Sequence, residues 1–126
     1  MDDCSCIYNP YEDNADLPGW YKTRYPTARV DHRCDECHRI IDAGEKYENT
    51  CGKWSHKFHY FTTCYDCVKA RSIFYCEGWA YGEVWHGIRE MIIENSCQVD
   101  WDEVARLSPH GLRLMISILE ECYEEF

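Results

Sequence analysis

The chain has no apolar run that approaches the roughly 18 residues needed by a membrane-spanning helix. Its N-terminus begins with acidic residues after Met1, and no basic and then apolar segment precedes Pro10, so we expect no secretory signal peptide. Together these absences predict a cytoplasmic protein that has no membrane partner. In that reducing compartment, paired cysteines bind metal ions more often than they form disulfides.

Sequence signatures of several enzyme classes are also absent. The six histidines form no HExxH motif, and no HxE precedes a PCxxC, which excludes the metalloprotease and deaminase patterns. The chain has no glycine-rich phosphate loop and no GxSxG motif. Asp31-His32 precedes the first CxxC pair, which is the wrong place for the histidines of an HNH nuclease. We therefore expect no catalytic residues and no enzymatic activity.

Positive charge is scarce: the chain has 13 Lys and Arg against 23 Asp and Glu, and its net charge is −10. The net charge is −3 over residues 1–28, +1 over residues 29–76 and −8 over residues 77–126. Nucleic-acid binding through a broad positive face is therefore disfavoured, because Lys and Arg contacts to phosphate supply most of that affinity. The acidic C-terminal third is better suited to a basic surface on a protein partner, or to solubility.

Cysteine is abundant, with ten residues, and four of them form two CxxC pairs. The pairs are Cys34-Asp-Glu-Cys37 and Cys64-Tyr-Asp-Cys67, separated by 26 residues. Each CxxC turn directs two sulfurs to one side, so two turns can complete a tetrahedral Cys4 shell around one Zn2+ ion. Such a shell leaves no coordination position for water or substrate, which predicts a structural zinc site formed by Cys34, Cys37, Cys64 and Cys67.

Further cysteines raise the question of a second zinc ion. Cys4 and Cys6 form a CxC pair, and Cys76 follows Cys67 closely, so these three are candidates for a second metal site beside the first. The sequence does not identify a fourth ligand; the candidates are Cys51, His32, His38 or a thiolate shared with the first ion. Cys97 and Cys122 fall in the helical part of the chain, where we expect them in the core.

The pattern along the chain predicts a small, metal-stabilised α+β fold in three parts. Residues 1–28, which are rich in aromatics and broken by proline, should form an irregular arm packed on the domain. Residues 29–76 should form a treble-clef-like zinc segment: a knuckle, a β-hairpin with strands at 46–51 and 58–63, and a second knuckle that leads into a helix over 68–74. Residues 77–126 should be helical and acidic.

Three C-terminal helices are predicted from periodicity and capping signals. The first runs from Val84 to about Asn95. Asp100 should cap a short second helix, and Ser108-Pro109 should begin the last one. The last helix should place one apolar stripe against the zinc segment, formed by Leu112, Met115, Ile116, Leu119, Tyr123 and Phe126.

These motifs resemble a group of small zinc-binding proteins of tailed bacteriophages and prophages, whose role is generally unassigned. The similar segments are Arg33–Ile41, Gly44–Tyr47, Thr63–Cys67, Phe74–Trp85 and the N-terminal Cys4-Ser-Cys6, which together span about residues 1–90. The resemblance implies a treble-clef or zinc-ribbon-like fold, bound zinc, and a phage accessory or host-takeover protein that acts in the bacterial cytoplasm.

Three functional hypotheses follow. The first is a non-enzymatic, zinc-stabilised interaction protein that binds a host or phage protein, in its sharper form an acidic inhibitor of a host nucleic-acid or defence enzyme. The second is a nucleic-acid-binding zinc finger that uses clustered cations and aromatic rings. Its candidate residues are Arg29, Arg33, Arg39, Lys53, Lys57, Lys69 and Arg71, with Trp54, Tyr60 and Phe61 for stacking. The third is a nuclease or thiol-redox enzyme.

Overall fold

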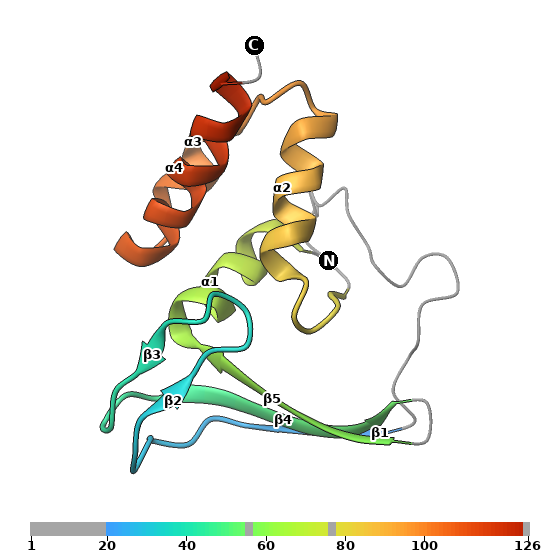
Figure 1. Cartoon of the computed structure of the whole chain (residues 1–126), viewed down its shortest axis with the longest axis vertical. Coiled ribbons are helices and arrows are strands. Elements are labelled where there is room, and N and C mark those ends of the chain that lie inside the picture. Colours follow the sequence, from blue (N-terminus) through green and yellow to red (C-terminus); the bar gives the residue numbers. More distant parts are fainter. Residues whose placement is uncertain (1–19, 55–56, 76–77, 125–126) are drawn as a thin grey trace.

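The structure is a computed structural model that describes residues 20–54, 57–75 and 78–124. These residues form an α+β fold with two antiparallel sheets and four helices (Figure 1). In Figure 1 the larger sheet occupies the lower part of the molecule and the helices lie above it. Most of the N-terminal arm, together with Cys4, Cys6 and Cys76, lies outside the described residues.

The larger sheet has three strands in the order β1-β4-β5. Strands β4 (Tyr47–Trp54) and β5 (Lys57–Cys64) form the predicted hairpin, although the strands extend further toward the turn than expected because Gly52 lies in β4 and does not end it. Strand β1 (Trp20–Arg24) pairs with β4. This strand was not predicted: the flanking prolines indicated irregular structure, whereas pairing with the distant β4 makes residues 20–24 extended.

The smaller sheet contains two short strands, β2 (His32–Arg33) and β3 (Ile40–Ile41), which pair in antiparallel fashion around the first CxxC turn. The side chain of Asp35 within this turn accepts a hydrogen bond from the backbone N–H of Thr62 on β5, at 2.7 Å. In return the N–H of Asp35 donates to the carbonyl of Thr62 at 2.8 Å. These bonds fix the first knuckle against the edge of the hairpin.

The four helices are α1 (Tyr65–Phe74), α2 (Val84–Glu94), α3 (Trp101–Ala105) and α4 (Pro109–Glu124). The predicted caps are confirmed: the Asp100 side chain accepts from the N–H of Asp102, and the Ser108 hydroxyl accepts from the N–H of Gly111. None of the described helices combines the length and the apolar character required to cross a bilayer.

Two apolar clusters form the core. One surrounds the CxxC cysteines and includes Ala28, Ile41 and Tyr47. The other lies between the helices and includes Phe74, Val84, Ile88, Ile92, Val104 and Met115. Helix α1 contributes to both clusters, and the half-buried Trp85 packs against both. The segment that holds the CxxC cysteines and the helical part are therefore packed together along α1 and the start of α2.

The apolar face of α4 differs from the predicted stripe. Met115 and Leu119 are buried as expected, together with Ile118 and Cys122. Three other members of the stripe point outward: Leu112 is 36% exposed, Ile116 45% and Tyr123 64%. The helix carries apolar side chains on two adjacent faces, and packing against α1 and α3 selects one of them.

A buried ion pair connects the larger sheet to α1. The Arg71 guanidinium donates to the Glu48 carboxylate, and these side chains are only 6% and 1% exposed. The same guanidinium lies 4.0 Å from the centre of the Trp79 ring. Nearby, the Tyr81 ring stacks on Phe61 with centroids 4.6 Å apart. This group of side chains covers the face of the sheet that points toward the helices.

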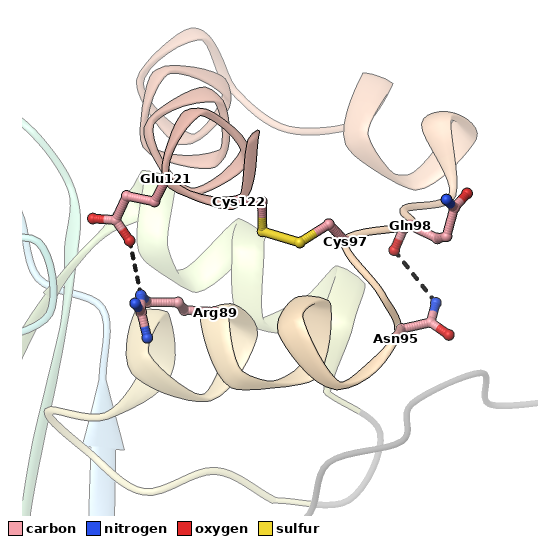
Figure 2. The surroundings of a disulfide bond; sticks show 6 residues. All are labelled: Arg89, Asn95, Cys97, Gln98, Glu121 and Cys122. Atoms are coloured by element: carbon pink, nitrogen blue, oxygen red, sulfur yellow. Dashed lines mark hydrogen bonds and ion pairs between the residues drawn. A yellow bond between two sulfur atoms is a disulfide. The ribbon is translucent and has the colours of Figure 1, made fainter. Parts of the chain in front are cut away.

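A disulfide joins Cys97, in the turn after α2, to Cys122 on α4, with Cα atoms 6.0 Å apart (Figure 2). Cys122 is buried and Cys97 packs against the helical cluster, so their expected place in the core is confirmed. The bond between them was not predicted, because spacing alone does not show that the turn after α2 returns to α4. Close by, Arg89 donates to Glu121 at 2.8 Å, also between α2 and α4 (Figure 2).

Candidate metal centre

The two CxxC pairs meet in a compact cluster of sulfur atoms. The Sγ atoms of Cys34, Cys37, Cys64 and Cys67 all lie within 4.8 Å of one another. Two of the separations are 3.8 Å, between Cys34 and Cys67, and 3.7 Å, between Cys37 and Cys64. A tetrahedron with metal–sulfur bonds of about 2.3 Å has edges of about 3.8 Å. The cluster therefore has the dimensions of a tetrahedral site that could hold one metal ion.

The first knuckle gets its shape from a tight turn between β2 and β3. The N–H of Cys34 donates to the carbonyl of Arg39, and the N–H of His38 donates to the carbonyl of Cys34. His38 adopts a left-handed backbone with φ of 66°, a conformation that is uncommon without glycine but enriched for His. This reversal returns the chain to β3 and leaves both sulfurs on one side of the turn.

The second knuckle coincides with the start of a helix. Cys64 ends β5 and is the N-cap of α1, while Cys67 lies in the first turn of that helix. The N-terminal end of a helix carries partial positive charge, which stabilises anionic thiolates placed there. Cys34, Cys64 and Cys67 are fully buried, and Cys37 is partly buried.

Backbone N–H groups donate directly to one of the sulfurs. The N–H of Glu36 and the N–H of Cys64 each lie 3.3 Å from the Sγ atom of Cys34. Such bonds offset the negative charge that four thiolates bring to a buried site. The Cys34 sulfur thus receives a donor from each knuckle.

Two side chains from the helical part also contact the sulfurs. The indole N–H of Trp85 on α2 donates to the Sγ atom of Cys67 at 3.2 Å. The Nε2 atom of His110, in the first turn of α4, lies 3.4 Å from the Sγ atom of Cys37. These outer contacts orient the ligands and connect the metal centre with the C-terminal helices.

Glu36, inside the first CxxC turn, makes a third connection to the helical part. Its buried carboxylate accepts from the N–H of Gly82 at 2.8 Å and from the N–H of Val84 at 3.1 Å. It therefore satisfies the first N–H group of α2, which has no partner within the helix, and one N–H group of the turn before it. Burial raises the pKa of Glu36 to about 7, against the opposite effect of these two hydrogen bonds.

The thiols are strongly coupled to one another. Hydrogen bonding with Cys37, then with Cys64 and Cys67, lowers the pKa of Cys34 far below its ordinary value. The pKa values of Cys37 and Cys67 are raised, in both cases chiefly by their bonds to Cys34. Four like charges at these distances need a cation among them, because mutual repulsion otherwise keeps protons on some of the sulfurs. A metal ion bound among the four sulfurs would replace those protons.

The candidates for a second metal site are not brought together in the described part of the chain. Cys4, Cys6 and Cys76 lie outside it. Cys51 is half-buried on β4, and the His32 ring lies tilted against the Tyr47 ring, with centroids 4.8 Å apart. Among residues 20–54, 57–75 and 78–124, the four CxxC cysteines form the one group with metal-binding geometry.

The cations suggested for nucleic-acid binding are dispersed. Arg39 pairs with Glu45 at 2.9 Å and with Asp66 at 3.0 Å, and Arg71 is buried against Glu48. The others lie on different elements: Arg29 before β2, Arg33 on β2, Lys53 on β4, Lys57 on β5 and Lys69 on α1. Trp54 ends β4, and its side chain lies outside the described part. Of the two suggested rings on β5, Phe61 stacks on Tyr81 and Tyr60 is exposed.

Sequence spacing identified the four sulfur ligands but missed Glu36, Trp85 and His110. Glu36 carried a weak signal, since it lies inside a CxxC pair. His110 carried no signal in the sequence, because it is 73 residues from the cysteine whose sulfur it contacts.

Comparison with protein-family models, curated proteins and solved structures finds no match for this chain.

Proposed function

We propose that this chain is a zinc-stabilised, non-enzymatic interaction protein with a treble-clef-like zinc segment. The observation that carries the proposal is the cluster of four sulfurs within 4.8 Å of one another, which can supply all four ligands of a tetrahedral ion. A zinc ion bound in this way has no free position for water or substrate, so it acts in folding and not in turnover. Thiolate ligands in tetrahedral geometry favour Zn2+ over ions such as Mg2+ or Ca2+, which prefer oxygen.

The order of elements supports the treble-clef-like assignment. A knuckle between two short strands is followed by a hairpin, and the second knuckle opens a helix. A reducing cytoplasm suits this centre, because its ligands must be thiolates. The Cys97–Cys122 disulfide would be protected from reduction in the cytoplasm, because Cys122 is buried and cytoplasmic thiols would have limited access to it.

The surface best suited to a protein partner is the outer side of α4. Leu112, Ile116 and Tyr123 form an exposed apolar stripe on this helix, with the exposed carboxylate of Glu120 beside it. Residues 77–126 carry a net charge of −8. An apolar stripe bordered by acid fits a basic, apolar segment of another protein, in which the rings and aliphatic side chains supply affinity and the charge supplies steering.

The resemblance to phage zinc proteins suggests the class of protein to which that partner belongs. We extend the proposal to a phage accessory protein that binds a host or phage protein with a basic surface. One version is an acidic inhibitor that occupies the nucleic-acid site of a host defence enzyme. Competition between this protein and the nucleic acid for a candidate enzyme would separate the inhibitor from a general adaptor.

Replacing the stripe should strongly reduce capture of the partner without unfolding the chain. We expect the variant Leu112→Ser/Ile116→Ser/Tyr123→Ser to recover at least about tenfold less partner than the parent, which corresponds to about 1.4 kcal/mol of binding free energy. The measurement is quantitative affinity purification from the cells in which the chain is naturally made, at low and high salt. A photo-crosslinker placed at Ile116 should label the same partner.

The matched control is a crosslinker at Lys69, an exposed position on α1. Labelling of the same partner from Lys69 but not from Ile116 would contradict the assignment to α4. Nucleic-acid hydrolysis or disulfide reduction with turnover by the pure protein would overturn the non-enzymatic proposal as a whole.

A further inference from the structure

One face of the larger sheet carries exposed side chains over most of its length, and its end row, Tyr47 and Cys64, is buried beside the CxxC cysteines. Side chains directly opposite each other in an antiparallel sheet share a face, and alternate residues along each strand share it too. By the register of β1, β4 and β5, one face carries Lys22, Arg24, Lys53, Phe58 and Tyr60. We call it the outer sheet face. The opposite face carries Glu48 and is covered from the side of the helices. In Figure 1 the helices all lie on one side of the sheet.

The charge of the outer sheet face is opposite to that of the whole chain. Three of the eleven positions that the register places on this face are cations, and none is an acid, although the net charge of the chain is −10. In the described part of the chain, no carboxylate forms an ion pair with Lys22, Arg24 or Lys53. Their positive charge is therefore available to an anionic ligand.

Two aromatic rings lie on the same face as these cations, on the edge strand β5 next to β4. Tyr60 is 71% exposed and Phe58 is 59% exposed, and both are on β5. The register places Phe58 opposite Lys53 and places Tyr60 in the same cross-strand row as Lys22. Aromatic rings that lie open on a sheet beside cations are the arrangement by which sheets stack the bases and hold the phosphates of single-stranded nucleic acid.

We propose that the outer sheet face binds single-stranded nucleic acid. Duplex nucleic acid fits less well, because its bases are stacked inside the helix and do not reach the two rings. An acidic protein segment would use the three cations but would make no use of the exposed ring of Tyr60. Binding of a single strand at this face requires a local set of three cations and two rings. It does not require the broad positive surface that the net charge of the chain excludes. It is independent of the protein-binding surface on α4.

The test is fluorescence anisotropy of a labelled 20-nucleotide oligo(dT), titrated with the full-length zinc-loaded protein. We expect binding that weakens about twentyfold between 50 and 200 mM salt, because three phosphate contacts to a single strand give a slope of about −2. Tyr60→Ala should weaken binding about 5-fold to 150-fold, the range measured for loss of one stacked base. Lys22→Ala and Arg24→Ala should each make the salt slope shallower by about 0.7.

The matched control is Arg113→Ala, which removes an exposed cation from α4 and should leave affinity and slope unchanged. Several results would overturn the proposal: no anisotropy change at 50 mM salt, equal loss in Arg113→Ala, or tighter binding of a 20-base-pair duplex. Equal competition by poly-glutamate would overturn it too, since that would show recognition of charge without bases. Circular dichroism of each variant confirms that a loss of binding is not a loss of fold.

Discussion

Cys64→Ser should abolish metal binding and the cooperative unfolding transition of the zinc segment. Cys64 supplies one of the four sulfurs, ends β5 and begins α1, so its loss opens the metal shell at the junction of the hairpin and the helix. Structural zinc contributes on the order of 10–16 kcal/mol in small domains, which matches the whole stability of an ordinary domain. Elemental analysis and thermal unfolding followed by circular dichroism would measure both losses.

Cys51→Ser is the matched control, because Cys51 is a half-buried free cysteine on β4 outside the metal cluster. It should retain metal and unfold at nearly the parent temperature. A chelator added to the parent should reproduce the Cys64→Ser result. If Cys64→Ser unfolded like the parent, the four-sulfur centre would be refuted. A second equivalent of zinc in the parent, lost on Cys76→Ser, would support the second site.

Glu48→Ala should lower the free energy of unfolding by about 3–5 kcal/mol, the usual cost of leaving one member of a buried ion pair without its partner. The Arg71 guanidinium would stay buried between the sheet and Trp79, with its charge uncompensated. Urea unfolding of the zinc-loaded protein would measure the change. Replacing both members, as in Glu48→Leu/Arg71→Met, should recover most of the loss because no charge is then buried.

Glu121→Ala is the control for this second prediction. Glu121 also pairs with an arginine, Arg89, but the two side chains are 58% and 36% exposed, so the loss should be about 0–1 kcal/mol. Equal effects of Glu48→Ala and Glu121→Ala would show that burial of the Arg71–Glu48 pair has no energetic importance.

Local signals predicted most of the fold. The CxxC spacing, the alternation along the hairpin and the caps at Asp100 and Ser108 each depend on residues a few positions apart, and all of them are found in the structure. Strand β1 could not be predicted in this way, because it is extended only through its pairing with β4. The buried face of α4 could not be predicted either. Leu112 and Met115 both fit a helical apolar pattern, and only tertiary packing determines that Met115 is buried and Leu112 exposed.

In the candidate metal centre, too, local features could be predicted from the sequence and tertiary contacts could not. Its four ligands could be predicted because each knuckle is a local turn with a fixed spacing. The two side chains that contact them, Trp85 and His110, come from α2 and α4, and their approach depends on how these helices pack on the CxxC turns. His110 and Trp85 would be ordinary helix residues if the sequence alone were considered, yet each contacts a sulfur.

The bond between Cys97 and Cys122 encloses α3 and most of α4 in a covalent loop. Arg106 and Arg113, both exposed, lie within this loop. A protease that cuts once after either arginine would therefore produce a nicked chain whose two pieces migrate as a single species on a gel. Adding a reductant should release a C-terminal fragment, so the oxidation state of one cysteine pair decides whether such a cut has any visible effect.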